Sequence, residues 1–168
     1  MFRALPLPPG VPGRLFLHSM PGRNEPLSDS IAAIRANGVD RVISLAPLAD
    51  IQEDSPAYAA LIAQGTPDWQ QEVFPIEDFR IPTDLDAYLT FFERMAGSLR
   101  AGETLLLHCA AGIGRTGMGA VTLLLLLGVP LDAAQATVRE AGSRAEAPEQ
   151  HAFLQRVAAH IEGSAGAG

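Results

Sequence analysis

The chain has 168 residues, 48% of them hydrophobic, and a formal net charge of −7 from 19 acidic and 12 basic residues. This length suits one well-buried core and is short for two, so we expect a single domain over residues 1–168. The basic residues are all arginines and form no cluster, which argues against nucleic acid or an anionic membrane as a partner. The only cysteine, Cys109, excludes an intrachain disulfide and favours a reducing compartment, so we expect a cytoplasmic protein. We also expect it to be a monomer.

Strands and helices alternate along the sequence. The lead-in over residues 1–13 contains four prolines and no signal pattern. In chain order, the patterns then predict a strand at 14–18, a helix at 28–37, a strand at 41–46, a surface loop at 49–54, a helix from 55–56 to 65, a strand at 69–76, a helix at 84–99, a strand at 104–107, helices at 116–127, 132–140 and 149–161, and a flexible tail at 163–168. This alternation indicates an α/β fold with a mainly parallel central sheet of four to five strands and helices on both faces.

Residues 108–117 read H-C-A-A-G-I-G-R-T-G and join the apolar run 104–107 to the helical run 116–127. Glycines allow such a loop to curl so that several backbone N–H groups point inward. The following helix adds the positive end of its dipole. The segment therefore predicts a cradle for a phosphate-sized anion at the carboxyl end of a strand.

The side chains in this loop suit covalent phosphoryl transfer. Cys109 stands beside the amide nest, the helix N-terminus and a guanidinium, which all favour the thiolate, so we expect the sulfur to be ionised at neutral pH. Arg115 offers a planar fork that can hold two phosphoryl oxygens at once. Thr116 can place a hydroxyl near the sulfur and stabilise the thiolate as it leaves a phosphocysteine.

A leaving alkoxide or phenoxide needs a proton, and the segment 73–84, V-F-P-I-E-D-F-R-I-P-T-D, offers candidates for the acid. Asp78 lies at the centre of a short loop between two prolines and is the preferred general acid. Glu77, Asp84 and Asp86 compete for the role. Asp84 and Asp86 fall where Thr83 is expected to open a helix, which favours helix capping for both of them.

The signature H-C-x-x-G-x-x-R-T-G, with P-I-x-D-x-x-x-P about thirty residues earlier, resembles the cysteine-dependent protein tyrosine and dual-specificity phosphatase superfamily. The layout is similar to that of its compact single-domain members related to cyclin-dependent-kinase-inhibitor phosphatases, which include small bacterial proteins. The resemblance implies a protein tyrosine phosphatase-like fold and residues 109–115 as the phosphate loop. It also implies Cys109 as nucleophile, Arg115 as phosphate clamp and Asp78 as general acid. No metal or organic cofactor is implied.

The same resemblance bears on the substrate, which we expect to be a phosphorylated protein or peptide. Inositol-lipid phosphatases tend to carry lysines in this loop, and this chain has none. Phosphotyrosine is the favoured target, with phosphoserine and phosphothreonine left open. The loop between Pro75 and Pro82 that carries Asp78 is called the acid loop below. Phe79 is expected either to form a wall of the substrate pocket or to anchor this acid loop in the core. The residues expected to bind the phosphate are Ala110, Ala111, Gly112, Ile113, Gly114 and Arg115.

Three further assignments stay open in the sequence. Gln150 or Glu146 is a candidate to position the hydrolytic water, and an exposed first-turn position is an equal alternative for Gln150. His108 is expected to hydrogen-bond the loop backbone as a structural group. Two other functions compete with the protein phosphatase: a non-catalytic phosphoprotein-binding module, and the same chemistry on an inositol phosphate, a nucleotide or an RNA 5′ end.

Overall fold

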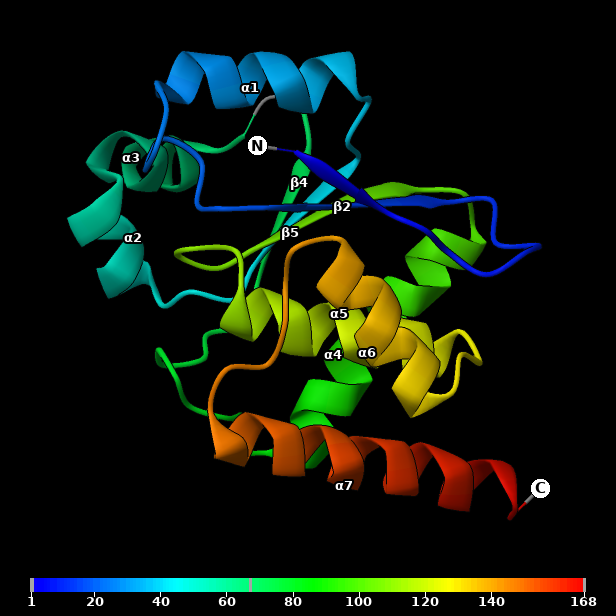
Figure 1. The fold of residues 1–168 in the computed structure, drawn as a ribbon. Coiled ribbons are helices and arrows are strands. Elements are labelled where there is room, and N and C mark those ends of the chain that lie inside the picture. The colour runs from blue at the N-terminus through cyan, green and yellow to red at the C-terminus, as the bar shows by residue number, and fades with distance from the viewer. Residues whose placement is uncertain (1, 67, 168) are drawn as a thin grey trace.

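A five-stranded sheet with the strand order β1-β2-β5-β3-β4 runs through the computed structural model, which describes residues 2–66 and 68–167 (Figure 1). The strands are β1 (Arg3–Leu5), β2 (Arg14–His18), β3 (Arg41–Ser44), β4 (Gln70–Val73) and β5 (Thr104–His108). The helices are α1 (Leu27–Ala36), α2 (Leu48–Asp54), α3 (Pro56–Gln64), α4 (Leu85–Arg100), α5 (Gly114–Leu126), α6 (Leu131–Glu140) and α7 (Pro148–Ala165). The first pair, β1 and β2, is antiparallel, and the other three pairs are parallel.

The central strand β5 determines where the site lies. All five of its residues are buried, because β2 and β3 flank it and helices cover both faces. His18 of β2 and Ser44 of β3 both pair with His108 at its carboxyl end. Three parallel strands therefore end in one row, and the loops that follow them meet at this edge of the sheet.

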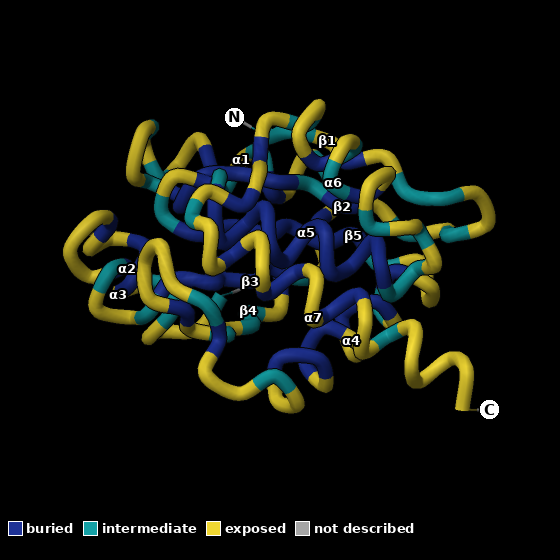
Figure 2. Tube along the Cα trace, turned by 60° about the horizontal axis from the view of Figure 1, so that its bottom comes forward, coloured by how far each residue is buried: buried dark blue, intermediate teal, exposed yellow. Residues whose placement is uncertain are grey.

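Alternate residues of β5 enter different cores, as expected for a strand buried on both faces. Leu105 and Leu107 join the large cluster formed mainly with α4, α5 and α7. Leu106 packs with residues of the opposite face, including Ile34 of α1. Figure 2 shows the buried segments of β5 and α5 side by side through the centre of the molecule. The loop that joins these two elements is thus held between two well-packed supports.

The predicted fold class is confirmed, while several local expectations are wrong. The lead-in contains β1, whose three residues pair with β2, and the expected loop at 49–54 belongs to helix α2. The last helix continues to Ala165, through the first half of the expected flexible tail, whose final residue lies outside the described residues. Asp84 caps α4 by accepting a hydrogen bond from the Ala87 N–H at 3.0 Å, so the helix begins one residue later than expected. Within residues 2–66 and 68–167, no helix has the length and apolar character needed to cross a membrane.

Candidate active site

The strand, loop and helix predicted around Cys109 are present. β5 ends at His108, and α5 begins at Gly114. The Cys109 side chain is buried, and the Thr116 hydroxyl donates a hydrogen bond to its sulfur over 3.1 Å. A hydroxyl donor of this kind stabilises a sulfur that carries negative charge.

Glycine is required at one point of this loop. Gly112 has a φ of 75°, a left-handed conformation that side chains with a Cβ rarely adopt. A Cβ at this position would also collide with the His18 carbonyl oxygen at the end of β2. The loop is therefore curled tightly against the neighbouring strand, as the glycine pattern predicts.

Arg115 is almost completely buried, with 1% of its surface exposed, and acidic groups surround its outer nitrogens. Its Nη1 donates to the Ile76 carbonyl at 2.8 Å and to the Asp50 carboxylate at 3.1 Å, and its Nη2 lies 3.3 Å from Asp78 Oδ1. Its Nε has no hydrogen-bond partner among the described residues. A buried donor without a partner is costly, so this N–H is available to an anion that enters the loop.

The structure brings Asp78 to Arg115 from 37 positions away in the sequence. Asp78 lies on the loop after β4, is 58% exposed, and also accepts a hydrogen bond from the Phe79 N–H at 3.1 Å. Among the described carboxylates, Asp50 and Asp78 are the ones paired with the Arg115 guanidinium. Asp84 caps α4 instead, as the capping interpretation expects.

Phe79 has an unusual backbone conformation for a residue with a side chain. Its φ is 58°, and 57% of its surface is exposed. The alternative that Phe79 anchors the acid loop in the core is therefore wrong. Because such a conformation costs energy and persists only where the surroundings impose it, Phe79 is held beside Asp78 with its ring at the surface.

Gln150 is fully buried, so the alternative of an exposed first-turn residue is wrong. Its Oε1 accepts hydrogen bonds from the Glu146 and Ala147 N–H groups at 2.9 and 3.3 Å, and its Nε2 donates to the Arg80 carbonyl at 3.2 Å. The side chain thus joins the start of α7 to the acid loop. Glu146 is exposed, and its carboxylate lies beside Gly114. A role for either residue in placing water stays a prediction.

A buried chain of hydrogen bonds supports the start of the loop that follows β5. His108 Nδ1 lies 2.9 Å from the Cys109 carbonyl, which confirms the expected contact with the loop backbone, and its Nε2 lies 2.9 Å from the Tyr58 hydroxyl. Burial lowers the pKa of His108 to about 4 and raises that of Tyr58, so both groups are neutral at pH 7. Gln71 donates to the Tyr58 oxygen at 3.0 Å, which leaves the phenol proton for Nε2 and the imidazole proton on Nδ1 for the Cys109 carbonyl.

Three residues that contact the site were missed in the sequence: Asp50, Arg3 and Ser143. Asp50 reaches Arg115 from α2, a helix that the sequence does not predict. Arg3 donates to the Gly112 carbonyl at 2.7 Å, and so does the Ser143 hydroxyl. These contacts join segments far apart in the chain, and the local sequence around each residue carries no motif that indicates them.

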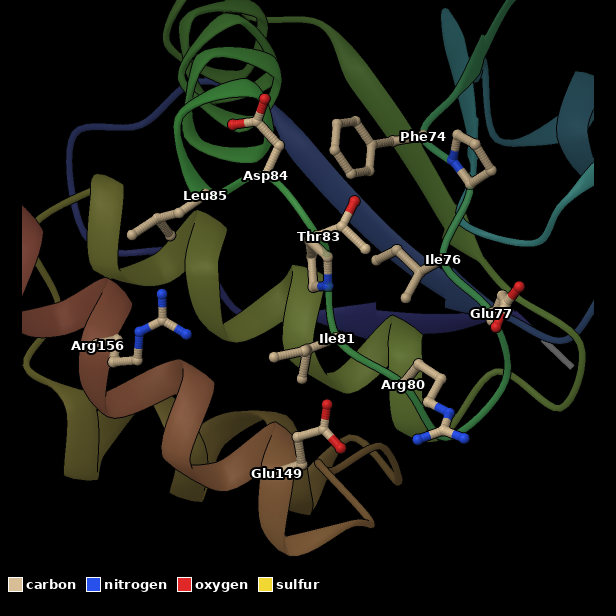
Figure 3. Close-up of a pocket in the computed structure, with 12 residues that line it drawn as sticks. Phe74, Ile76, Glu77, Arg80, Ile81, Thr83, Asp84, Leu85, Glu149 and Arg156 are labelled. Atoms are coloured by element: carbon tan, nitrogen blue, oxygen red, sulfur yellow. The ribbon is translucent and has the colours of Figure 1, made fainter.

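A groove of about 650 Å³ lies beside the acid loop and not over the cysteine (Figure 3). The acid loop and the start of α4 form one side of it, and Glu149 and Arg156 of α7 form the other. Cys109 and Arg115 are not among its lining residues. The groove therefore flanks the loop that carries Asp78 and is distinct from the anion cradle.

Comparison with known proteins agrees with this geometry. A family model described as a tyrosine phosphatase family matches residues 34–140, whereas no curated protein matches the chain. Among solved structures, the fold is similar to that of a kinase-associated phosphatase with serine in place of its catalytic-site cysteine, with a TM-score of 0.82 and 17% identity over 96% of both chains. Human DUSP28 gives a TM-score of 0.68 and 21% identity over 98% of this chain and 99% of its own. PTPMT1 in complex with PI(5)P gives a TM-score of 0.68 and 16% identity over 90% of this chain and 94% of its own.

The residues matched by the family model make up more than half of the chain and include the loop with Cys109 and Arg115. The structural neighbours share the fold across nearly the whole chain. The chain therefore belongs to the tyrosine phosphatase family, and it shares its fold with the kinase-associated phosphatase and DUSP28.

Proposed function

We propose that this cysteine-based phosphatase hydrolyses phosphotyrosine in proteins, with phosphoserine and phosphothreonine as further substrates, through a phosphocysteine intermediate. Cys109 is the nucleophile, Arg115 binds the phosphoryl oxygens together with the loop amides, and Asp78 is the general acid. The observation that carries the proposal is the Nε atom of Arg115, a buried donor with no partner among the described residues, on the same side chain that pairs with Asp78.

In the first step, the Cys109 thiolate attacks phosphorus, and the S–P bond forms as the ester P–O bond breaks. Asp78, in its acid form, gives its proton to the departing oxygen. In the second step, water attacks phosphorus, Asp78 accepts its proton, and the S–P bond breaks to release inorganic phosphate. Thr116 donates a hydrogen bond to the sulfur, which stabilises the thiolate that this step regenerates.

The proposal predicts release of phosphate from para-nitrophenyl phosphate in the presence of EDTA. Cys109→Ser should abolish this release, because a serine hydroxyl at this site lacks the ionised, polarisable nucleophile. If Cys109→Ser retains the activity, the nucleophile assignment is wrong. If the wild-type protein binds a phosphotyrosine peptide but releases no phosphate, the non-catalytic binding module is supported instead.

The Asp78→Asn variant removes the proposed proton donor and leaves Cys109 and Arg115 unchanged. Loss of the proton donor should lower kcat by about a hundredfold for a phenyl ester with a poor leaving group and far less for a nitrophenyl ester. Asp84→Asn is the matched control, because Asp84 stands on the same loop but caps α4. An equal loss on both esters in Asp78→Asn would assign the acid role elsewhere.

The substrate class is tested by a panel of phosphotyrosine, phosphoserine and phosphothreonine peptides, inositol phosphates, nucleotides and an RNA 5′ phosphate. Absence of lysine from the chain and the neutral side chains of Ala110, Ala111 and Ile113 favour the peptides over polyanionic inositol phosphates. The fold similarity to PTPMT1 in complex with PI(5)P is the reason to include the inositol group. A kcat/KM higher for an inositol phosphate than for every peptide would replace the proposed substrate.

A further inference from the structure

The phosphate loop is held from outside by a side chain near the start of the chain. Arg3 lies in β1, which pairs antiparallel with β2 so that Arg3 stands opposite Leu17. Its guanidinium is half-buried and spans three acceptors. Nη1 donates to the Ala141 carbonyl at 2.8 Å and to the Ser143 hydroxyl oxygen at 2.9 Å, and Nη2 donates to the Gly112 carbonyl at 2.7 Å.

The Gly112 carbonyl receives a second donor, since the Ser143 hydroxyl lies 2.7 Å from it. Arg3, Ser143 and Gly112 therefore form a closed triangle of hydrogen bonds. The peptide group after Gly112 is planar, so its carbonyl and the Ile113 N–H point in opposite directions. With the carbonyl held toward Arg3, the Ile113 N–H is directed away from Arg3, as a donor to a bound anion must be.

Arg3 also acts through its charge. Burial lowers the pKa of Arg3, and electrostatic attraction to Cys109 opposes this shift. A hydrogen bond from a charged donor is stronger than one from a neutral donor. Arg3 therefore supplies both a fixed carbonyl and positive potential on the outer side of the loop, where Arg115 does not reach.

We propose that Arg3, with Ser143 as its partner, is a positioning residue that holds the phosphate loop in its anion-binding conformation and favours the thiolate of Cys109. The inference rests on the proposed use of Cys109 and the loop. Strand β1 lies in a segment without a recognisable motif, and by this inference it contributes a residue that positions the phosphate loop.

The test compares Arg3→Met with Arg14→Met. Arg14 is a matched control because it is also an arginine of the sheet's first strands, and its guanidinium donates to the Asn37 carbonyl and the Thr104 hydroxyl, far from the loop. For each folded variant, the rate of Cys109 alkylation by iodoacetamide is measured against pH, together with kcat/KM and inhibition by inorganic phosphate.

In Arg3→Met we expect the pH at the midpoint of the alkylation profile to rise by roughly 0.5 to 1 pH unit. We also expect kcat/KM to fall about tenfold and phosphate inhibition to weaken by a similar factor. Arg14→Met should match the wild type in all three measurements, even if its melting temperature falls. Equal behaviour of the two variants, or an unchanged alkylation profile in folded Arg3→Met, would overturn the inference.

Two further variants keep the test informative if Arg3→Met does not fold. Arg3→Lys retains the charge but cannot span three acceptors, so the alkylation midpoint should return toward the wild-type value while phosphate inhibition stays weak. Ser143→Ala removes the second donor and should weaken phosphate inhibition by a few fold. Wild-type behaviour of both would overturn the inference. Alkylation requires no turnover, so a wild-type protein that releases no phosphate contradicts the proposed function without deciding the role of Arg3.

Discussion

At the scale of single residues, the sulfur of Cys109 and the hydroxyl of Thr116 form the most direct contact in the site. Both groups are buried, and the 3.1 Å hydrogen bond joins the end of β5 to the first turn of α5. In the proposed mechanism the Thr116 hydroxyl, which carries no charge, stabilises negative sulfur without competing with Arg115 for phosphate. This division predicts separate kinetic effects for the two residues.

Thr116→Val keeps the shape of the side chain and removes the donor. We expect kcat to fall by about ten- to a hundredfold, because the thiolate becomes a poorer leaving group in the second step. Accumulation of phosphocysteine should then appear as a burst of nitrophenolate in rapid-mixing experiments.

Thr122→Val is the matched control, since Thr122 is a buried threonine of the same helix that bonds Met118 and Tyr88 instead of the sulfur. It should keep the wild-type kcat and show no burst. A Thr116→Val enzyme with unchanged kcat would contradict the assigned role.

Protonation of His108 should make the free energy of unfolding depend on pH. Its folded pKa is about 4, whereas an unfolded histidine titrates near 6.5. Between these values the unfolded chain binds a proton that the folded imidazole does not, so the free energy of unfolding falls as pH is lowered through this window. The loss should reach about 3 kcal/mol near pH 4 and then stop growing.

Urea unfolding of the wild type and His108→Gln at a series of pH values from about 4.5 to 7.5 measures this slope. The variant should show a flatter dependence on pH. Glu25, Glu72 and Glu103 have lowered pKa values, so their stabilisation begins to be lost as pH falls through the usual carboxyl range near 4.5. Both proteins carry these three residues, so this loss cancels in the comparison. Equal slopes in the two proteins would show that His108 is not the group that titrates.

At the scale of elements, glycines set how closely α5 approaches its neighbours. A Cβ on Gly117 would lie 2.5 Å from the Arg144 carbonyl carbon, so the helix packs directly on the backbone before α7. Gly97 in the exposed face of α4 has no such neighbour within 4 Å. Close packing therefore requires glycine at position 117 but not at position 97.

We expect Gly97→Ala to stabilise the protein by about 0.5–1 kcal/mol, the usual difference in helix propensity. Gly117→Ala should destabilise it by more than that, since backbone must move apart. It should also lower kcat/KM, because Gly117 follows Thr116 directly. Thermal unfolding and steady-state kinetics of both variants measure this, and a stabilised Gly117→Ala protein would contradict the close packing.

The elements also show why part of the fold could be predicted and part could not. The β5-loop-α5 segment could be predicted because apolar runs, glycines and a helical run follow one another locally. β1 and α2 could not, since β1 has only three residues and ends before Pro6, and α2 begins after Pro47 without a side-chain cap. Cys109 and Arg115 lie six positions apart, in the loop and the first turn of α5, whereas Asp50 and Arg3 reach this segment only through tertiary packing. Local patterns carry no record of such contacts.

At the scale of the whole molecule, charge and stability change over the same range of pH. The net charge is −7 at pH 7, and the isoelectric point of the sequence is about 5.0. As pH falls toward that value, repulsion between molecules is lost while protonation of His108 in the unfolded state favours unfolding. We expect light scattering of concentrated protein to be greatest near pH 5 and lower in His108→Gln at the same pH. Equal scattering at pH 5 and pH 7 would contradict this expectation.

The arrangement of the outermost strands has a consequence for self-association. β1 offers only three residues at one border of the sheet, and β4 at the other carries Glu72, which pairs with Arg41 and Arg94 at 2.6 and 3.0 Å. A further strand that docked on β4 would have to disturb this charged cluster, and one that docked on β1 would gain few ladder hydrogen bonds. Neither border is a good template for fibrillar growth, so aggregates formed near the isoelectric point should redissolve when the pH is raised.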